Sequence, residues 1–263
     1  MTYENDAPRA KKSLGQNFLQ DKNIARKIVD LLRIGAADKV LEIGPGPGML
    51  TGFLQEAAPA RLFLVEKDYH WARERQNGSH GGTPSQVILA DALGIPWERF
   101  ECAWKIVGNL PYNVASPLIW DILSRVKGLE RAVFMVQKEV GQRLAAEPGS
   151  SAYGALSVWV QSFARPKMEF IVPPQVFRPA PKVHSAVVSF DPLAACARPE
   201  NPAGLSSLLK ICFQQRRKQL GTIFRSAGLA PNALEQAGIS ADLRPERLSP
   251  AQFKQLSRCL LAD

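Results

Sequence analysis

The feature that most constrains the fold is an apolar segment, Lys39–Ile43, that runs directly into the sequence Gly-Pro-Gly-Pro-Gly at 44–48. A helical pattern follows at 49–57, and a strand that continues through a glycine turn into a helix is typical of an open α/β sheet. Further strands are predicted at 61–66, 86–89, 105–108 and 131–136, and helices at 68–75 and 116–126. Because the strands are apolar on both faces, they favour a parallel sheet covered by helices.

Two short sequence features refine this prediction. Ser116 followed by Pro117 predicts that the helix at 116–126 begins with a serine N-cap and a proline in its first position. The Gly- and Ser-containing segment 76–85 predicts a surface loop.

The pattern changes after Tyr153. An amphipathic helix is predicted at 153–163, and two strands at 168–172 and 185–190 are close enough in sequence to be antiparallel neighbours. The Pro- and Ala-rich segment 191–204 is typical of a linker, and roughly the last 60 residues predict a short helical unit. We therefore expect a larger domain over 1–195 and a small all-helical domain over 196–263.

Composition and charge limit the classes of function. The chain has 263 residues with a net charge of +9, which favours a polyanionic partner such as nucleic acid. No apolar run is long enough to span a membrane, and the polar N-terminus has no apolar signal core. The four cysteines have no CxxC spacing, which predicts reduced thiols in a cytoplasmic protein and no metal site.

Polar residues stand where successive predicted strands end. Gly44 and Gly46 would let a ligand approach the backbone, Glu66 can accept hydrogen bonds from two ribose hydroxyls, and Asp91 can accept one from an adenine amine. Each has a structural alternative, such as a ligand-free turn or a carboxylate that caps a helix. Together they predict one nucleoside across the carboxyl edge of the sheet. The turn is not GxGxxG, so S-adenosylmethionine fits better than NAD.

The fourth of these strands ends in Asn109-Leu-Pro-Tyr112. In isolation a proline turn with a half-buried tyrosine would be the better interpretation. After the preceding strand ends, the order resembles the amino-methyltransferases, whose motif of this type holds an exocyclic amine. The Asn109 side-chain oxygen and the Leu110 carbonyl can each accept one N6–H of adenine, Pro111 stiffens the turn, and Tyr112 can stack on a flipped base. Positioning and electrostatics would then supply the catalysis.

The whole chain resembles one family more specifically. From about residue 12 onward it is similar to the small-subunit ribosomal RNA adenine dimethyltransferases, whose motifs occur here in order. These motifs lie at 12–19, 44–48, 109–112, 137–140, 153–158, 172–174, 177–183 and 213–218.

The resemblance implies a function and further site residues. Asn17 and the Leu19 backbone would close over the methionine part of the cofactor, Gly44 would lie beneath it, and Asn109 would touch both cofactor and base. Phe177 would face Tyr112 across the target adenine, although it can also be read as a loop aromatic that packs on prolines. The family dimethylates N6 of two adjacent adenosines in the last hairpin loop of 16S ribosomal RNA, in the immature small subunit. Nothing in the sequence indicates more than a monomer.

The basic residues have two interpretations. From 205 to 230 the chain has five cations and no acidic residue, which predicts either a solvated helix face or an RNA-binding surface. We favour RNA binding, with contacts to phosphates by the following cations: Lys11, Lys12, Arg216, Arg217 and Lys218.

Two positions depart from the family pattern. His184 stands where the family usually has Asp, so it is left out of the site, and Pro47 stands where Leu or Ala is common.

Three other functions stay open. The alternatives are an antibiotic-resistance methyltransferase of large-subunit RNA, a non-catalytic ribosome-assembly factor, and a DNA adenine methyltransferase. The motifs at 153–158 and 213–218 favour the small-subunit enzyme, and about 60 helical residues leave little room for a DNA target-recognition region.

Overall fold

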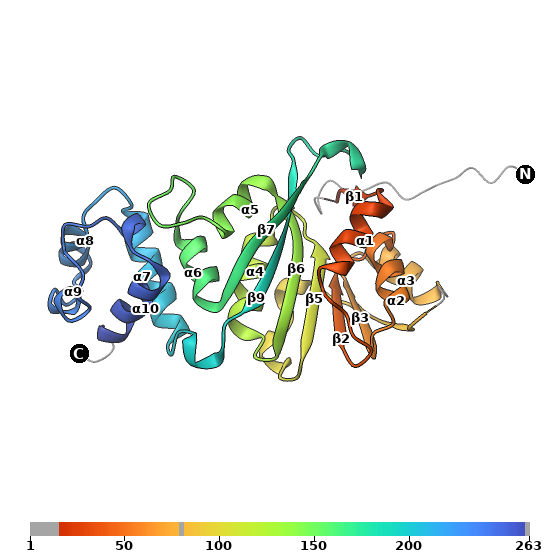
Figure 1. The fold of residues 1–263 in the computed structure, drawn as a ribbon, viewed down its shortest axis with the longest axis horizontal. Coiled ribbons are helices and arrows are strands. Elements are labelled where there is room, and N and C mark those ends of the chain that lie inside the picture. The colour runs from red at the N-terminus through yellow and green to blue at the C-terminus, as the bar shows by residue number, and fades with distance from the viewer. Residues whose placement is uncertain (1–15, 79–81, 261–263) are drawn as a thin grey trace, which may run out of the picture.

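The structure is a computed structural model that describes residues 16–78 and 82–260. A body built on one large sheet lies beside a group of helices formed by the last part of the chain (Figure 1). Within the described residues this sheet has seven strands. They are β2 (Lys39–Ile43), β3 (Arg61–Glu66), β4 (Ser85–Leu89), β5 (Trp104–Asn109), β6 (Leu129–Gln137), β7 (Ala164–Val172) and β9 (Ser185–Pro192).

The strand order is β4-β3-β2-β5-β6-β9-β7. The first five strands are parallel, as the sequence predicts. β9 is antiparallel to β6, and β7 is antiparallel to β9, so the predicted antiparallel pair is confirmed and makes the sheet mixed. The chain adds β3 and β4 on one side of β2 and then β5 on the other. The carboxyl ends of β2 and β5 therefore flank a topological switch point, where open α/β sheets bind ligands.

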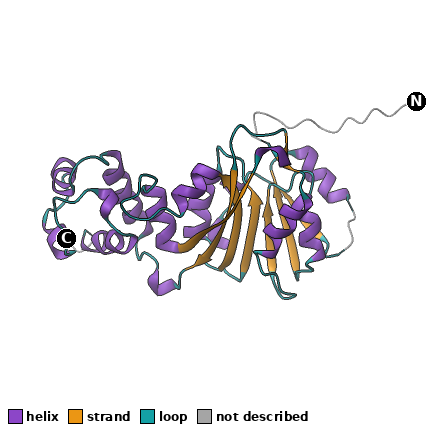
Figure 2. Cartoon of the chain, turned by 45° about the horizontal axis from the view of Figure 1, so that its top comes forward, coloured by secondary structure: helices purple, strands orange, loops and turns teal. Residues whose placement is uncertain are grey.

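Helices cover both faces of the sheet (Figure 2). The α-helices of the described residues, including those of the C-terminal group, are α1 (Lys22–Asp30), α2 (Met49–Glu56), α3 (Tyr69–Asn77), α4 (Ala115–Arg125), α5 (Lys138–Leu144), α6 (Ala155–Phe163), α7 (Pro202–Gln214), α8 (Leu220–Ala227), α9 (Asn232–Gln236) and α10 (Pro250–Cys259). Successive strand residues point to opposite faces. Val40 is thus buried with Leu54 of α2, and the next residue, Leu41, is buried with Ile119 of α4. This double burial explains why the strands are apolar throughout.

Helix α4 begins one residue earlier than predicted. Its N-cap is Val114, which makes no side-chain capping bond, so the prediction that Ser116 is the cap is wrong. The N–H groups of Val114 and Ala115 donate instead to the Pro111 carbonyl, both at 3.1 Å. The turn at 109–112 therefore leads straight into the helix, and Ser116 falls inside its first turn.

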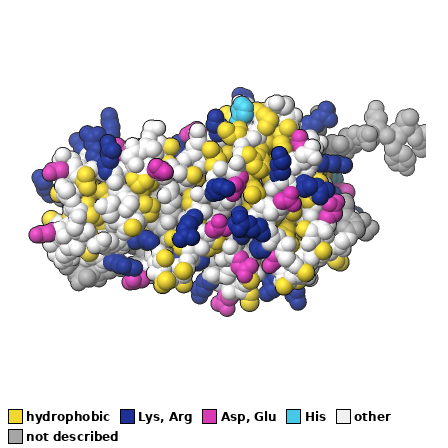
Figure 3. Space-filling view, in the orientation of Figure 1, with side chains coloured by type: hydrophobic (Ala, Val, Ile, Leu, Met, Phe, Trp, Pro, Cys, Tyr) yellow, Lys and Arg dark blue, Asp and Glu magenta, His cyan; other side chains and the backbone are white. Residues whose placement is uncertain are grey.

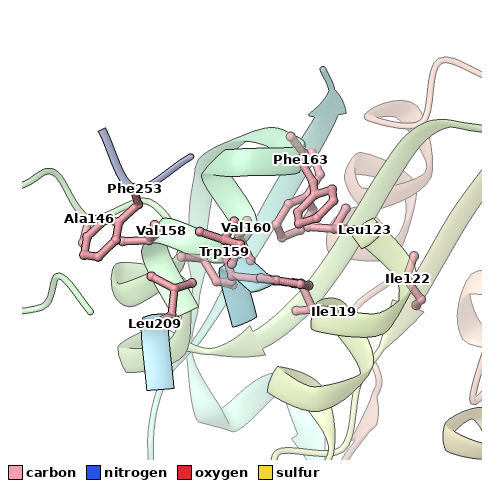
Figure 4. Close-up of a cluster of buried hydrophobic side chains, with 14 of the residues drawn as sticks. Ile119, Ile122, Leu123, Ala146, Val158, Trp159, Val160, Phe163, Leu209 and Phe253 are labelled. Carbon is pink, nitrogen blue, oxygen red and sulfur yellow. The ribbon is translucent and has the colours of Figure 1, made fainter. Parts of the chain in front are cut away.

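The C-terminal helices pack on the sheet body through α6. Figure 4 shows Trp159 and Phe163 of α6 near side chains of α4, while Val158 lies near Leu209 of α7 and Phe253 of α10. These residues belong to one buried cluster that extends from the sheet into the last helices. The all-helical character of this region is confirmed. The division into domains at residue 195 stays a prediction.

The predicted linker at 191–204 is shorter than expected. β9 continues to Pro192, and α7 begins at Pro202, where the Asn201 side chain accepts a capping bond of 2.9 Å from the Gly204 N–H. Among the described residues no helix is long and apolar enough to cross a membrane. The same residues contain no cluster of acidic, His and Cys side chains that could hold a metal ion.

Candidate active site

A cleft of about 1000 Å³, part of it open to solvent, lies at the carboxyl edge of the sheet. Its walls come from the ends of β2, β3, β4 and β5 and from the segment 16–18 that precedes the first helix. The predicted ligand-facing strand ends are thus brought together at the switch point. Gly44, Gly46, Glu66, Asp91 and Asn109 all line this one cleft.

The glycine turn presents bare backbone to the cleft. Gly44, Gly46 and Gly48 have φ angles of 66°, 49° and 91°, in the left-handed region that favours glycine. A side chain at Gly44 would meet nothing within 4 Å, whereas one at Gly46 would lie 3.0 Å from the Phe18 ring. Gly44 therefore leaves room for a ligand, and Gly46 leaves room for Phe18.

Glu66 is fixed in place by backbone donors. Its carboxylate accepts a bond of 3.1 Å from the Gly46 N–H and one of 2.8 Å from the Asp68 N–H. The residue is only 6% exposed. Burial raises the pKa of Glu66 above its usual range, and the backbone donors at Asp68 and Gly46 act in the opposite direction. The Glu66 carboxylate therefore fixes the position of the glycine turn relative to the end of β3.

Asp91 begins the short 3-10 turn at 92–94, where it accepts a bond of 3.1 Å from the Leu93 N–H. Its other oxygen receives a bond of 2.7 Å from Lys67 Nζ. The hydrogen bond from Lys67 is the main cause that holds the pKa of Asp91 below its usual range. Asp91 is thus an ionised acceptor at the cleft wall.

The turn at 109–112 is tied to three separate parts of the chain. Asn109 Nδ2 donates a bond of 2.9 Å to the Asn17 carbonyl, and the Leu110 N–H donates one of 3.1 Å to the Met135 carbonyl of β6. The Tyr112 hydroxyl lies 2.8 Å from Ser185 Oγ at the start of β9. Partial burial raises the pKa of Tyr112, so the phenol is neutral near pH 7.

The described residues of the N-terminal motif, 16–19, lie partly at the cleft and partly in the buried core. Asn17 and Phe18 line the cleft, and the Phe18 ring packs edge-on against Trp71 with centroids 5.3 Å apart. Leu19 belongs to the short strand β1 (Phe18–Leu19), which pairs antiparallel with β8 (Phe177–Arg178), so Leu19 lies opposite Phe177. Both of these side chains are buried in the cluster beneath α1 and α2. They are not among the described residues that line the cleft, whereas Tyr112 is.

The predicted RNA-binding residues differ in their surroundings. Lys11 and Lys12 lie outside the described residues. Arg217 and Lys218 are exposed in the connection between α7 and α8. Arg216 instead forms an ion pair of 2.7 Å with Glu246. Figure 3 shows Lys and Arg side chains gathered at the upper left, above α7 and α8.

Comparison with known proteins decides the family. A profile described as ribosomal RNA adenine dimethylase matches residues 7–261. The chain belongs to the ribosomal RNA adenine dimethylase family.

Relatives within this family share nearly the whole length of the chain. A protein of Oleidesulfovibrio alaskensis named ribosomal RNA small subunit methyltransferase A is 60% identical over 259 residues, covering 97% of this chain and 92% of that protein. One of the same name from Lawsonia intracellularis is 49% identical over 257 residues, covering 95% and 93%. The predicted family is therefore confirmed.

Solved structures of two other proteins share the fold of this chain. A dimethyladenosine transferase from Plasmodium falciparum superposes with a TM-score of 0.77 at 26% identity, covering 91% of this chain and 95% of that one. The 23S ribosomal RNA methyltransferase ErmE superposes with a TM-score of 0.69 at 24% identity, covering 93% and 99%. Because ErmE is less than 25% identical, its likeness shows a shared fold alone. The relatives with high identity are named small-subunit methyltransferases, and they favour the small-subunit interpretation over the large-subunit alternative.

The sequence interpretation did not identify two residues that line the cleft and one buried carboxyl group next to it in sequence. Phe18 and Lys67 line the cleft, and each is a direct neighbour of a predicted site residue. Glu42, immediately before the predicted strand end, is 1% exposed and accepts a bond of 2.7 Å from Thr51 Oγ1. Burial raises the pKa of Glu42 to about 7. An acidic residue inside an otherwise apolar strand was the signal that could have identified it.

Proposed function

We propose that this protein transfers methyl groups from S-adenosylmethionine to N6 of two adjacent adenosines in the 3′-terminal hairpin loop of 16S ribosomal RNA. The observation that carries the proposal is the position of Asn109. It lies in the same cleft as Gly44, Glu66 and Asp91 and begins the turn that ends at Tyr112. Acceptors for a nucleoside and acceptors for an amine thus meet in one site.

The cleft residues fit the proposed cofactor. A nucleoside needs acceptors for its ribose hydroxyls and its adenine amine, and the site has an oriented carboxylate at Glu66 and an ionised one at Asp91. The open space over Gly44 would admit the methionine part, and Asn17 lines the same cleft. When bound, S-adenosylmethionine supplies the methyl group.

The residues at 109–112 would orient the target amine. Because Asn109 Nδ2 donates to the Asn17 carbonyl, Oδ1 is the atom that would accept an N6–H. The Leu110 carbonyl would accept the second one. These two bonds favour a pyramidal nitrogen with its lone pair directed at the methyl donor. No base has to remove a proton before attack, so the contribution is positioning and electrostatics.

The base itself would be held by aromatic stacking. Tyr112 is aligned by its contact with Ser185, which presents the ring as one wall of the base site. Phe177 would serve as the second wall only after its side chain leaves the buried cluster beside Leu19.

The exposed cations Arg217 and Lys218 would bind RNA phosphates, and the target base would be splayed out of its loop. We expect a monomer that acts on the immature small subunit in the cytoplasm, where that subunit is assembled.

Competing acceptors test the proposal. Radiolabelled methyl transfer is compared on small ribosomal subunits that lack the modification, on large-subunit RNA and on duplex DNA. The proposal predicts transfer to small subunits at a rate far above the other two. Equal or greater transfer to large-subunit RNA or DNA would reject it, and the absence of transfer to any acceptor would favour a non-catalytic assembly factor.

A further inference from the structure

Arg216 joins three segments that are distant in sequence. Its Nε donates a bond of 2.7 Å to Glu246 in the 3-10 turn Pro245–Arg247. Its Nη2 donates a bond of 3.0 Å to the Ser151 carbonyl, in the loop between α5 and α6. Arg216 itself lies in the connection between α7 and α8. One guanidinium group therefore bridges the last helices and the sheet body.

Two further bonds fasten the same joint. The Gly149 N–H donates a bond of 2.7 Å to the Glu246 carbonyl, and the buried Tyr153 hydroxyl donates one of 2.8 Å to the Leu248 carbonyl. Gly149 has a φ of 85°, a backbone conformation that favours glycine. The loop at 147–153 is thus held against the turn at 245–248 at several points, and Arg216 links this joint to the end of α7.

Arg217 and Lys218 follow directly after Arg216 and are exposed. The Lys218 N–H donates a bond of 2.8 Å to the Gln215 carbonyl, so residues 215–218 form one tight turn. A residue that fixes this turn also fixes the direction in which the two exposed cations point. Because a phosphate contact requires the cation to be held at the right place, the conformation of this turn should affect how tightly Arg217 and Lys218 bind RNA.

We propose that Arg216 is a positioning residue that holds Arg217 and Lys218 toward the RNA, and that it binds no phosphate itself. Two of its three guanidinium nitrogens, Nε and Nη2, already donate to a carboxylate and to a backbone carbonyl, and a phosphate would have to displace the Glu246 carboxylate to reach Nε. This inference rests on the proposed function and refines it, because it divides the three neighbouring cations at 216–218 into one that positions and two that bind.

Glu246→Gln distinguishes this role from direct phosphate binding, because the two roles predict opposite changes in RNA affinity. If Arg216 bound phosphate, removing the competing carboxylate would free it and strengthen RNA binding. If Arg216 positions its neighbours, the same change weakens binding about threefold to tenfold, the range expected when one or two phosphate contacts are impaired. Glu235→Gln is the matched control, since it removes one exposed acidic charge from α9 and should change affinity by less than about twofold.

Arg216→Lys is the second variant. It keeps the positive charge but has no planar fork that can reach both Glu246 and Ser151. Positioning predicts a loss similar to that of Glu246→Gln, and the double variant should be no weaker than the single ones because both changes break the same contact between Arg216 and Glu246. Direct phosphate binding predicts near wild-type affinity for Arg216→Lys.

The measurement is equilibrium binding of the full chain to unmethylated small ribosomal subunits, at a temperature where circular dichroism shows every variant folded. A role in stability alone would lower the melting temperature and leave affinity unchanged, and that result overturns the inference. It is also overturned if Glu246→Gln binds as tightly as the wild type or more tightly. If the wild type neither binds nor methylates these subunits, the proposed function fails as well. If the wild type both binds and methylates these subunits and the variants bind as tightly as the wild type, the positioning role alone is rejected.

Discussion

Asn109 Nδ2 donates a hydrogen bond of 2.9 Å to the backbone carbonyl of Asn17, 92 residues earlier in the chain. This bond connects the N-terminal motif to the turn that ends β5. It also determines which way the Asn109 amide faces, because Nδ2 is used within the protein and Oδ1 is the atom that would accept a hydrogen bond from a ligand. The N-terminal segment therefore contributes to the orientation of Asn109, the group that we propose binds the target amine.

Asn109→Ala tests this arrangement. It removes the acceptor for the amine and the bond to Asn17, so we expect methyl transfer to fall by at least about a hundredfold, as when one preorganised polar contact to a reacting group is lost. RNA binding should persist, because Arg217 and Lys218, the residues that we propose contact phosphates, lie elsewhere. Asn109→Asp is the control that keeps the acceptor, and it should retain more activity than the Ala variant. Rates are measured in single turnovers with saturating RNA, and equal rates for wild type and Asn109→Ala would exclude the proposed role.

Tyr112→Phe and Tyr112→Ala separate stacking from hydrogen bonding. The Phe variant keeps the ring and loses only the contact with Ser185, so we expect a rate within about tenfold of the wild type. The Ala variant also loses base stacking, worth about 1–3 kcal/mol, and should be slower again. Ser185→Ala should match Tyr112→Phe. A Phe variant as slow as the Ala variant would mean that the hydroxyl, rather than the ring, is what matters.

Glu42→Gln tests the energetic cost of the buried carboxyl group. Burial raises the pKa of Glu42 from 4.5 to about 7, so the folded state binds a proton more tightly than the unfolded chain does. Ionising this group therefore destabilises the fold as pH rises from 4.5 to 7. The variant keeps an acceptor for Thr51. We expect its free energy of unfolding to exceed that of the wild type by up to about 3 kcal/mol at pH 8, with the difference gone below pH 4.5.

Urea unfolding at several pH values measures this effect. Glu130→Gln is the control, since it removes an exposed carboxyl group and should change stability by less than about 0.5 kcal/mol. A stability difference for Glu42→Gln that is the same at pH 8 and pH 4 would contradict the assignment.

Arg217→Ala and Lys218→Ala test the RNA-binding surface. Each should weaken RNA binding and reduce the slope of log affinity against log salt concentration by about 0.7 to 0.9, the value for one phosphate contact. Lys127→Ala removes an exposed cation that follows α4, at the amino-terminal edge of the sheet, and should leave the slope unchanged. Affinities are measured by filter binding across a salt series. An unchanged slope in both variants would show that these residues are a solvated surface.

The central strands could be predicted to within about two residues because each combines a continuous apolar run with a polar or glycine end. The site followed from the same rule, since parallel strand ends meet at one edge of the sheet. Local patterns could not predict the pairing of β1 with β8. Strands of two residues are too short to show alternation, and this tertiary pairing buries Leu19 and Phe177 together.

Arg216 shows a second limit of local reasoning. The absence of acidic residues from 205 to 230 indicated free cations, but the ion-pair partner Glu246 lies beyond that range and reaches Arg216 only in the folded chain. Ser116 is similar, since its suitability as a cap did not matter once the Pro111 carbonyl had accepted the first N–H bonds of the helix. For Arg216 a tertiary contact overrode the local charge pattern, and for Ser116 the preceding turn overrode the residue's preference for the cap position.

The central claim is tested most directly by mapping the products of methyl transfer on small ribosomal subunits that lack the modification. The wild-type protein is incubated with these subunits and S-adenosylmethionine, and the RNA is then analysed by primer extension and nucleoside mass spectrometry. The account predicts N6,N6-dimethyladenosine at two adjacent positions in the hairpin loop near the 3′ end, with a new stop in primer extension. Methylation at any other site, or no stop in that loop, would contradict it.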